Sequence, residues 1–114
     1  MSGLYHWTCE HSAINIRATR TVRVHMKLSW WTDLAKAGKR TRFACGLSSN
    51  LLTCDRMQYR CLAADPSLLI HWMEYRCTLP ARHVADLENA PGAQPDHWWV
   101  AEGPVPVRSI RRMS

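Results

Sequence analysis

The sequence lacks long apolar runs: none of its hydrophobic stretches approaches the roughly 20 residues that a helix needs to cross a bilayer. Its first residues, MSGLYHWTCEH, lack the cationic start followed by an apolar stretch that marks an export signal. We therefore expect a cytoplasmic protein without a membrane partner. In that compartment its five cysteines are expected to stay reduced.

The cysteines also lack the spacing of a metal site. Their number is odd, which argues against a complete disulfide framework, and no two of them form a Cys-x-x-Cys pair. The run Cys9-Glu10-His11 is too tight for the usual zinc knuckle. We expect no metal ion, and we interpret the cysteines as small buried hydrophobic residues.

Common phosphate-binding and catalytic motifs are missing as well. The chain has no Walker-type loop and no G-x-G-x-x-G, which excludes the standard glycine-rich loops that cradle a phosphate. It has no G-x-S-x-G elbow and no H-E-x-x-H. His6, Cys9 and His11 lie close in sequence, but a Cys/His nucleophile needs a geometry that spacing alone does not give.

Positive charge, by contrast, is abundant. The chain carries 15 Lys and Arg against 9 Asp and Glu, and its pI is near 9.4. This surplus favours a polyanionic partner: a nucleotide, a nucleic acid or an acidic protein. Much of it lies between Arg17 and Arg42 and at the C-terminus, so we predict one domain, 1–107, and a basic tail, 108–114. The tail is either a solvated, mobile end or a binding segment.

Tryptophan is also abundant, with six Trp against one Phe. A Trp side chain combines a large apolar surface with an N–H donor, which suits half-buried positions in cleft walls and interfaces. The alternative is that most of these side chains pack the core.

Strand-like patterns dominate the chain. Residues 21–28 alternate apolar with polar side chains, which predicts a half-buried strand. Its outer face is cationic and would meet a nucleic-acid backbone through Arg23, His25 and Lys27.

Other patterns complete the fold class. We predict further strands at 3–8, 57–63 and 97–101, a strand end at 29–34, a short helix capped by Thr8 and a helix at 80–89. Residues 68–77 fit a helix and a strand equally well. This order predicts an α+β fold: a small single domain with a mixed, mostly antiparallel twisted sheet and two or three short helices.

Three segments, in this order, resemble proteins of the ADP-ribosyltransferase-like superfamily, including small bacterial toxin-like members and RNA 2′-phosphotransferases. The first is Leu-Tyr-His-Trp-Thr at 4–8, similar to the opening strand whose His holds the nicotinamide ribose of NAD. The second is Ser-Trp-Trp-Thr-Asp-Leu at 29–34, and the third is His-Trp-Trp-Val at 97–100 with the Pro-rich segment after it. The start and finish also resemble a small family of uncharacterised actinobacterial and phage proteins.

The resemblance implies a fold with a cleft for NAD, a related nucleotide or an RNA end. Its implied binding residues are a ribose anchor, a stacking Trp, a hydroxyl donor and a phosphate-binding cation: His6, Trp31 or Trp30, Thr32 or Ser48, and Arg17 or Arg20. The last strand of active members carries a catalytic Glu. Here the nearest carboxylates are Asp96 and Glu102, which do not match that motif well, so the resemblance leaves catalysis open, with His6 as the other catalytic candidate.

A second hypothesis needs no catalysis. The chain would be a small phage-type or actinobacterial interaction protein that binds a host protein through exposed Trp and Arg side chains, which are common at binding hot spots. Each candidate site residue also has a structural alternative. His6 can be a core histidine, the Trp pair can be core, Thr32-Asp33 can cap a helix, and the arginines can form a solvated face.

Overall fold

A computed structural model describes residues 3–24, 28–36, 42–44, 51–53 and 57–113. Its three α-helices are α1 (Glu10–Thr19), α2 (Trp72–Tyr75) and α3 (Ala81–Glu88). Three short 3-10 helices lie at Pro66–Leu68, Arg76–Thr78 and Pro95–His97. The strands are β1 (Tyr5–Thr8), β2 (Thr21–Val22), β3 (Ser29–Thr32), β4 (Arg42–Ala44), β5 (Leu51–Thr53), β6 (Tyr59–Ala63), β7 (Ile70–His71), β8 (Trp98–Ala101) and β9 (Val105–Arg112).

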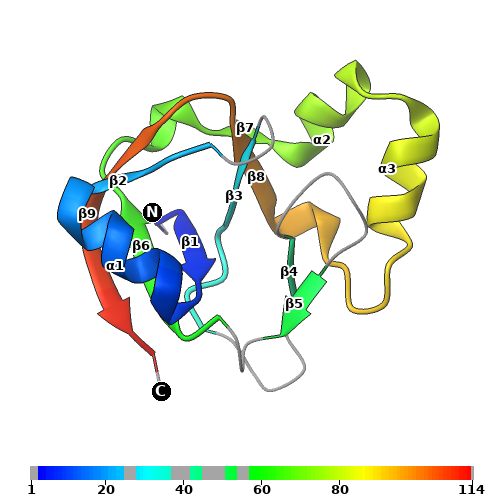
Figure 1. The fold of residues 1–114 in the computed structure, drawn as a ribbon. Helices are drawn as coiled ribbons and strands as arrows, with labels where there is room; N and C mark the ends of the chain where they lie inside the picture. The colour runs from blue at the N-terminus through cyan, green and yellow to red at the C-terminus, as the bar shows by residue number, and fades with distance from the viewer. Residues whose placement is uncertain (1–2, 25–27, 37–41, 45–50, 54–56, 114) are drawn as a thin grey trace.

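Seven of the strands form one sheet in the order β2-β9-β6-β1-β3-β8-β7, and β4 and β5 form a separate hairpin. Every strand pair among the described residues is antiparallel. In Figure 1, α1 lies beside β6 and β9, whereas α2 and α3 lie beyond β8. The predicted α+β class is confirmed.

Two apolar clusters fill the two faces of the sheet. Because side chains alternate along a strand, β3 sends Trp31 to one face and Trp30 to the other. The Trp31 cluster contains Ile16 of α1 together with Cys61 and the valines of β9. The Trp30 cluster contains apolar residues of α2 and α3. A third, smaller cluster joins Trp7 to the β4–β5 hairpin through Phe43.

Several local predictions are confirmed. Strand β6 alternates buried and half-buried residues as its sequence predicts, and β1, β3 and β8 fall in the predicted segments. Helix α3 buries Val84 and Leu87, the residues expected on its apolar face. The ambiguous segment 68–77 contains both elements, since Ile70 and His71 pair with β8 before α2 begins.

Other local predictions are wrong. Strand β2 has only two residues, and His25 and Lys27 of the predicted cationic face lie outside the described residues. Helix α1 has Cys9 at its N-cap instead of Thr8, which belongs to β1 and is buried. The chain turns from α1 into β2 through Arg20, whose φ of 56° is left-handed and whose N–H donates to the carbonyl of Ile16.

The predicted tail at 108–114 is also wrong for most of its length. Residues up to Arg112 belong to β9, which pairs with β6 from Val107 onward. This pairing places Ile110 opposite Cys61, whose side chain is fully buried. The last strand is therefore part of the sheet that the core is built on. The division into a domain ending at residue 107 and a separate tail cannot stand.

The Trp and Cys side chains differ in how far they are buried. Five Trp side chains are buried and Trp99 is half-buried, so the core interpretation applies to them and no Trp is exposed for partner binding. Cys61 is buried, as predicted, whereas Cys9 is half-buried and Cys77 is exposed. Cys45 and Cys54 lie outside the described residues.

None of the described helices is long and apolar enough to span a bilayer.

Candidate functional site

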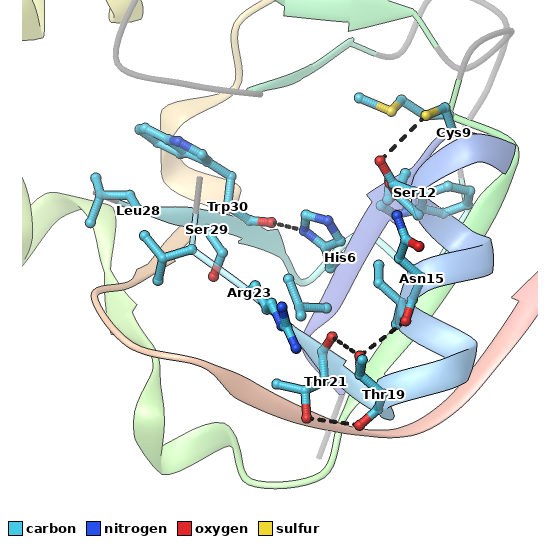
Figure 2. Close-up of a pocket in the computed structure, with 16 residues that line it drawn as sticks. His6, Cys9, Ser12, Asn15, Thr19, Thr21, Arg23, Leu28, Ser29 and Trp30 are labelled. Carbon is cyan, nitrogen blue, oxygen red and sulfur yellow. Dashed lines mark hydrogen bonds between the residues drawn. The ribbon is translucent and has the colours of Figure 1, made fainter. Parts of the chain in front are cut away.

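A pocket of about 680 Å³ lies between α1, β1, residues 21–24 and residues 28–30. This volume lies within the range of small-molecule sites. Met57 also lines it, and the β1–β3 pairing and the turn after α1 help to bring these parts of the chain together. Figure 2 shows His6 between two polar ends of the pocket, one at Cys9 and Ser12 and the other at Thr19 and Thr21.

One face of α1 supplies much of the wall. Ser12, Asn15, Ile16 and Thr19 all line the pocket, and their spacing of three, four and seven residues places them on a single helical stripe. Three of these four side chains are polar, so α1 presents hydrogen-bonding groups where a core-facing helix would present apolar ones. The polar stripe can be read from the sequence of α1, but the sequence does not reveal that this stripe faces a pocket.

His6 lines the pocket and is held in one orientation. Its Nδ1 lies 2.7 Å from the carbonyl oxygen of Trp30, and its ring packs against the ring of Trp31 at 5.3 Å between centroids. A carbonyl only accepts, so Nδ1 carries the proton and Nε2 of the neutral ring is left as an acceptor. Burial lowers the pKa of His6 below its ordinary value of 6.5, although the hydrogen bond to Trp30 opposes this effect. His6 is therefore neutral at pH 7.

This half-buried, neutral histidine predicts a pH dependence of the free energy of unfolding. Since its pKa is lower in the folded protein than in the unfolded chain, the unfolded chain binds more protons as the pH falls below 6.5. Its contribution to stability is complete above that pH and is lost as the pH falls toward the folded pKa. We expect the free energy of unfolding, measured with urea between pH 7 and pH 5, to fall by up to about 1.4 kcal/mol per pH unit from this group.

The variant His6→Gln removes the titrating group while keeping a polar side chain of similar reach. It should therefore show a shallower dependence than the wild type. The exposed Arg82 of α3 gives a control, because Arg82→Gln leaves His6 in place and should keep the pH dependence that His6 causes. Equal slopes in the wild type and in His6→Gln would contradict the burial of a neutral His6.

Cys9 and Ser12 form the second feature of the pocket. The thiol Sγ lies 3.6 Å from the hydroxyl of Ser12 at the start of α1. Burial alone would raise the pKa of the Cys9 thiol, but hydrogen bonds with Ser12 and with the backbone of His11 outweigh it and lower the pKa. Burial raises the pKa of the Cys61 thiol to about 12. The Cys9 thiol therefore ionises more readily than the Cys61 thiol.

Arg23 gives the pocket its charge. It is exposed at the end formed by Thr19 and Thr21, and the described lining residues include no Asp, Glu or Lys. The hydroxyl of Thr19 lies 3.0 Å and 3.2 Å from the carbonyls of Asn15 and Thr21, which fixes this corner. The pocket therefore combines a neutral acceptor, several hydroxyl and amide groups, and one guanidinium.

The predicted binding residues come together only in part. His6 and Trp30 line the pocket. Trp31 contacts His6 but is 2% exposed, so it supports the histidine from within the core and cannot stack on a ligand. Thr32 is buried beside a void of about 20 Å³ that is too small for a nucleotide, and its hydroxyl accepts from the N–H of Leu34.

The predicted cations and carboxylates lie elsewhere. Arg17 stacks over Tyr59 at 5.5 Å and Arg20 forms the turn after α1, and neither lines the pocket. Asp96 and Glu102 are exposed and also lie outside it. Ser48 falls outside the described residues.

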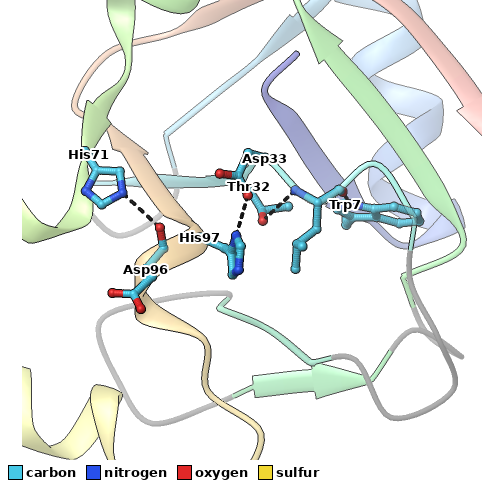
Figure 3. A network of polar contacts seen from close by, with 7 residues as sticks. Trp7, Thr32, Asp33, His71, Asp96 and His97 are labelled. Carbon is cyan, nitrogen blue, oxygen red and sulfur yellow. Dashed lines mark hydrogen bonds and ion pairs between the residues drawn. The ribbon is translucent and has the colours of Figure 1, made fainter. Parts of the chain in front are cut away.

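Figure 3 shows the surroundings of Asp96, where polar contacts connect the ends of β3 and β8. His71 bonds to the backbone carbonyl of Asp96 at 2.9 Å, and His97 pairs with Asp33 at 2.7 Å. Trp7 reaches the same region, since its Nε1 donates to the carbonyl of Leu34. These contacts fix the strand ends, and the Asp96 carboxylate has no part in the pocket. Among the described residues, no group of three or more metal-ligating side chains occurs.

Comparison with protein-family models, with curated proteins and with solved structures gives no match to this chain.

Proposed function

We propose that the pocket binds a nucleotide that carries a ribose and a phosphate, in the class of NAD and ADP-ribose. The supporting observation is His6, a neutral histidine whose Nδ1 is engaged by Trp30 and whose Nε2 is left as an acceptor. Ribose hydroxyls are donors that such an acceptor binds. The choice of ligand class comes from the resemblance of residues 4–8 to the NAD-binding strand, in which a histidine has this role.

The rest of the pocket is consistent with such a ligand. Arg23 can pair with a phosphate oxygen through a charge-assisted hydrogen bond. Ser12, Asn15 and Thr19 offer donors and acceptors along the α1 wall. We restrict the proposal to binding, because both predicted catalytic carboxylates lie outside the pocket and no other carboxylate lines it in the described part of the chain.

Thermal unfolding in the presence of ADP-ribose, NAD, AMP and ribose tests this proposal. A ligand that binds only the folded state at 100 times its Kd adds about 2.7 kcal/mol of stability, which corresponds to several degrees in Tm for a domain of this size. We expect ADP-ribose and NAD to raise Tm, AMP to raise it less, and ribose alone to have little effect.

Two variants and one control make the test specific. His6→Ala removes the acceptor and should abolish the shift, and Arg23→Ala should reduce it for the phosphate-bearing ligands. Arg82→Ala, an exposed arginine on α3 far from the pocket in sequence and structure, should leave it unchanged. Equal shifts in the wild type and in His6→Ala would place the ligand elsewhere, and no shift with any nucleotide would overturn the proposal.

A further inference from the structure

The last strand has an open edge. Strand β9 pairs with β6 on one side, whereas on its other side β2 reaches only Val105 and Pro106. The N–H of Val107 then donates to the carbonyl of Arg20 at 3.0 Å. From Arg108 to Arg112, this second side has no partner strand among the described residues.

The open edge is strongly cationic. Arg108, Arg111 and Arg112 are exposed, and they make up three of its five side chains. Arg108 has no partner on β6, because the register shifts between Leu62 and Ala63, and such a bulge redirects the extra side chain.

Neighbouring arginines add to this charge. Arg111 lies directly opposite Arg60, and like charges in that position destabilise a sheet. Arg112 lies opposite Tyr59, over whose ring Arg17 is stacked.

No described carboxylate compensates this charge. Two ion pairs of described residues, Arg76 with Glu88 and His97 with Asp33, lie away from β9. Three exposed arginines along an edge with no partner strand among the described residues are complementary to an extended chain that carries carboxylates.

We propose that an acidic, extended peptide segment of another protein binds here by adding a strand to β9. The edge supplies main-chain hydrogen bonds, and the arginines supply pairs for side chains that alternate along the added strand. This inference is independent of the nucleotide pocket.

The structure favours a peptide over a nucleic acid. Proteins that bind single-stranded nucleic acid combine cationic grooves with aromatic side chains on which bases stack. Tyr59, the aromatic residue that pairs with this segment opposite Arg112, is 7% exposed and already lies under Arg17. An open strand edge, on the other hand, has a direct use only for a peptide backbone.

NMR titration of the ¹⁵N-labelled protein tests the proposal. The probes are an acetylated ten-residue peptide of alternating Glu and Thr, the same peptide with Lys in place of Glu, and a twelve-residue oligothymidylate. We expect the Glu-Thr peptide to shift the amides of residues 108–112 and to protect them from hydrogen exchange. The Lys-Thr peptide should have no effect. N-methylation at alternate residues of the Glu-Thr peptide should abolish binding, because it removes main-chain donors.

Variants distinguish this surface from the pocket and from a general charge effect. The triple variant Arg108→Ala/Arg111→Ala/Arg112→Ala should weaken binding about tenfold, as expected for three exposed ion pairs. Arg82→Ala and His6→Ala should leave it unchanged. Binding of the oligothymidylate with no response to the Glu-Thr peptide would overturn the proposal in favour of a nucleic-acid surface. Binding of neither probe would also overturn it, and would mean that the arginines only prevent this edge from pairing with other copies of the chain.

Discussion

Replacement of Trp72 by alanine is expected to lower the free energy of unfolding by about 3–5 kcal/mol, the range for truncating a large buried aromatic side chain. Trp72 is fully buried in the cluster beneath α2 and α3, where it contacts the rings of Trp30 and Trp98. Its Nε1 also donates to Glu88 at 2.7 Å, so the substitution removes a charge-assisted hydrogen bond together with the packing. Urea unfolding followed by circular dichroism measures the loss.

Two further variants separate packing from hydrogen bonding. Trp72→Phe keeps an aromatic ring but loses the N–H, and should cost less than Trp72→Ala. Glu88→Gln keeps an acceptor for Trp72 but removes the ion pair with Arg76, which lies 3.2 Å away and is partly exposed, so its effect should be below about 1 kcal/mol. A loss below 1 kcal/mol for Trp72→Ala would contradict the arrangement of this core.

Removal of residues 108–114 is expected to abolish cooperative unfolding. The truncation deletes most of β9, so the backbone of β6 loses its partner from Tyr59 to Leu62. It also uncovers Cys61, which is fully buried beside Ile110. Since small domains are stable by only about 5–15 kcal/mol in total, the loss of a central strand pairing removes the folded state. Near-UV circular dichroism and the thermal transition measure the outcome.

The full-length variant Arg108→Ala/Arg111→Ala/Arg112→Ala is the matched control for this truncation. It removes the charge of the segment but keeps the strand, and it should unfold cooperatively with a Tm close to that of the wild type. A truncated protein with a wild-type transition would contradict the assignment of these residues to the sheet, and would support a separate basic tail.

Local sequence patterns correctly predict those strands and helices that bury one face and expose the other. Strand β6 shows this, since its alternation of apolar and polar residues matches its burial. Helix α3 is a second case, because Val84 and Leu87 are one helical turn apart and face a single cluster. In such elements, the period of the sequence and the direction of burial agree.

The end of the chain could not be predicted in the same way. Pro104 and Pro106 disfavour a central strand, yet β9 begins at Val105 and tolerates Pro106, where pairing with β2 is brief. Residues 21–28 have a clear alternation, but β2 pairs over only two residues. Both results depend on contacts between segments far apart in the sequence, which local periodicity does not contain.

Of the described residues that were predicted to bind a nucleotide, only His6 and Trp30 line the pocket. His6 lines the pocket, and its role in binding a ribose stays a prediction. The prediction that Trp31 and Thr32 line the same pocket is wrong, because the β3–β8 register pairs them with Trp99 and Trp98 inside the sheet. The polar stripe of α1 was missed, since Ser12, Asn15 and Thr19 resemble an ordinary solvent-exposed helix face until the fold places them against a pocket.

The central claim is that His6 offers a neutral acceptor to a nucleotide in the α1 pocket. A long-range ¹H–¹⁵N spectrum of the histidine rings, recorded at pH 7 while ADP-ribose is added, tests it most directly. The account predicts that Nε2 of His6 is unprotonated without ligand, and that its resonance moves in a saturable way as the nucleotide binds. The ring resonances of the exposed His83 should stay in place. A His6 ring that is protonated at pH 7, or one whose Nε2 resonance stays fixed while other residues respond to ADP-ribose, would contradict the account.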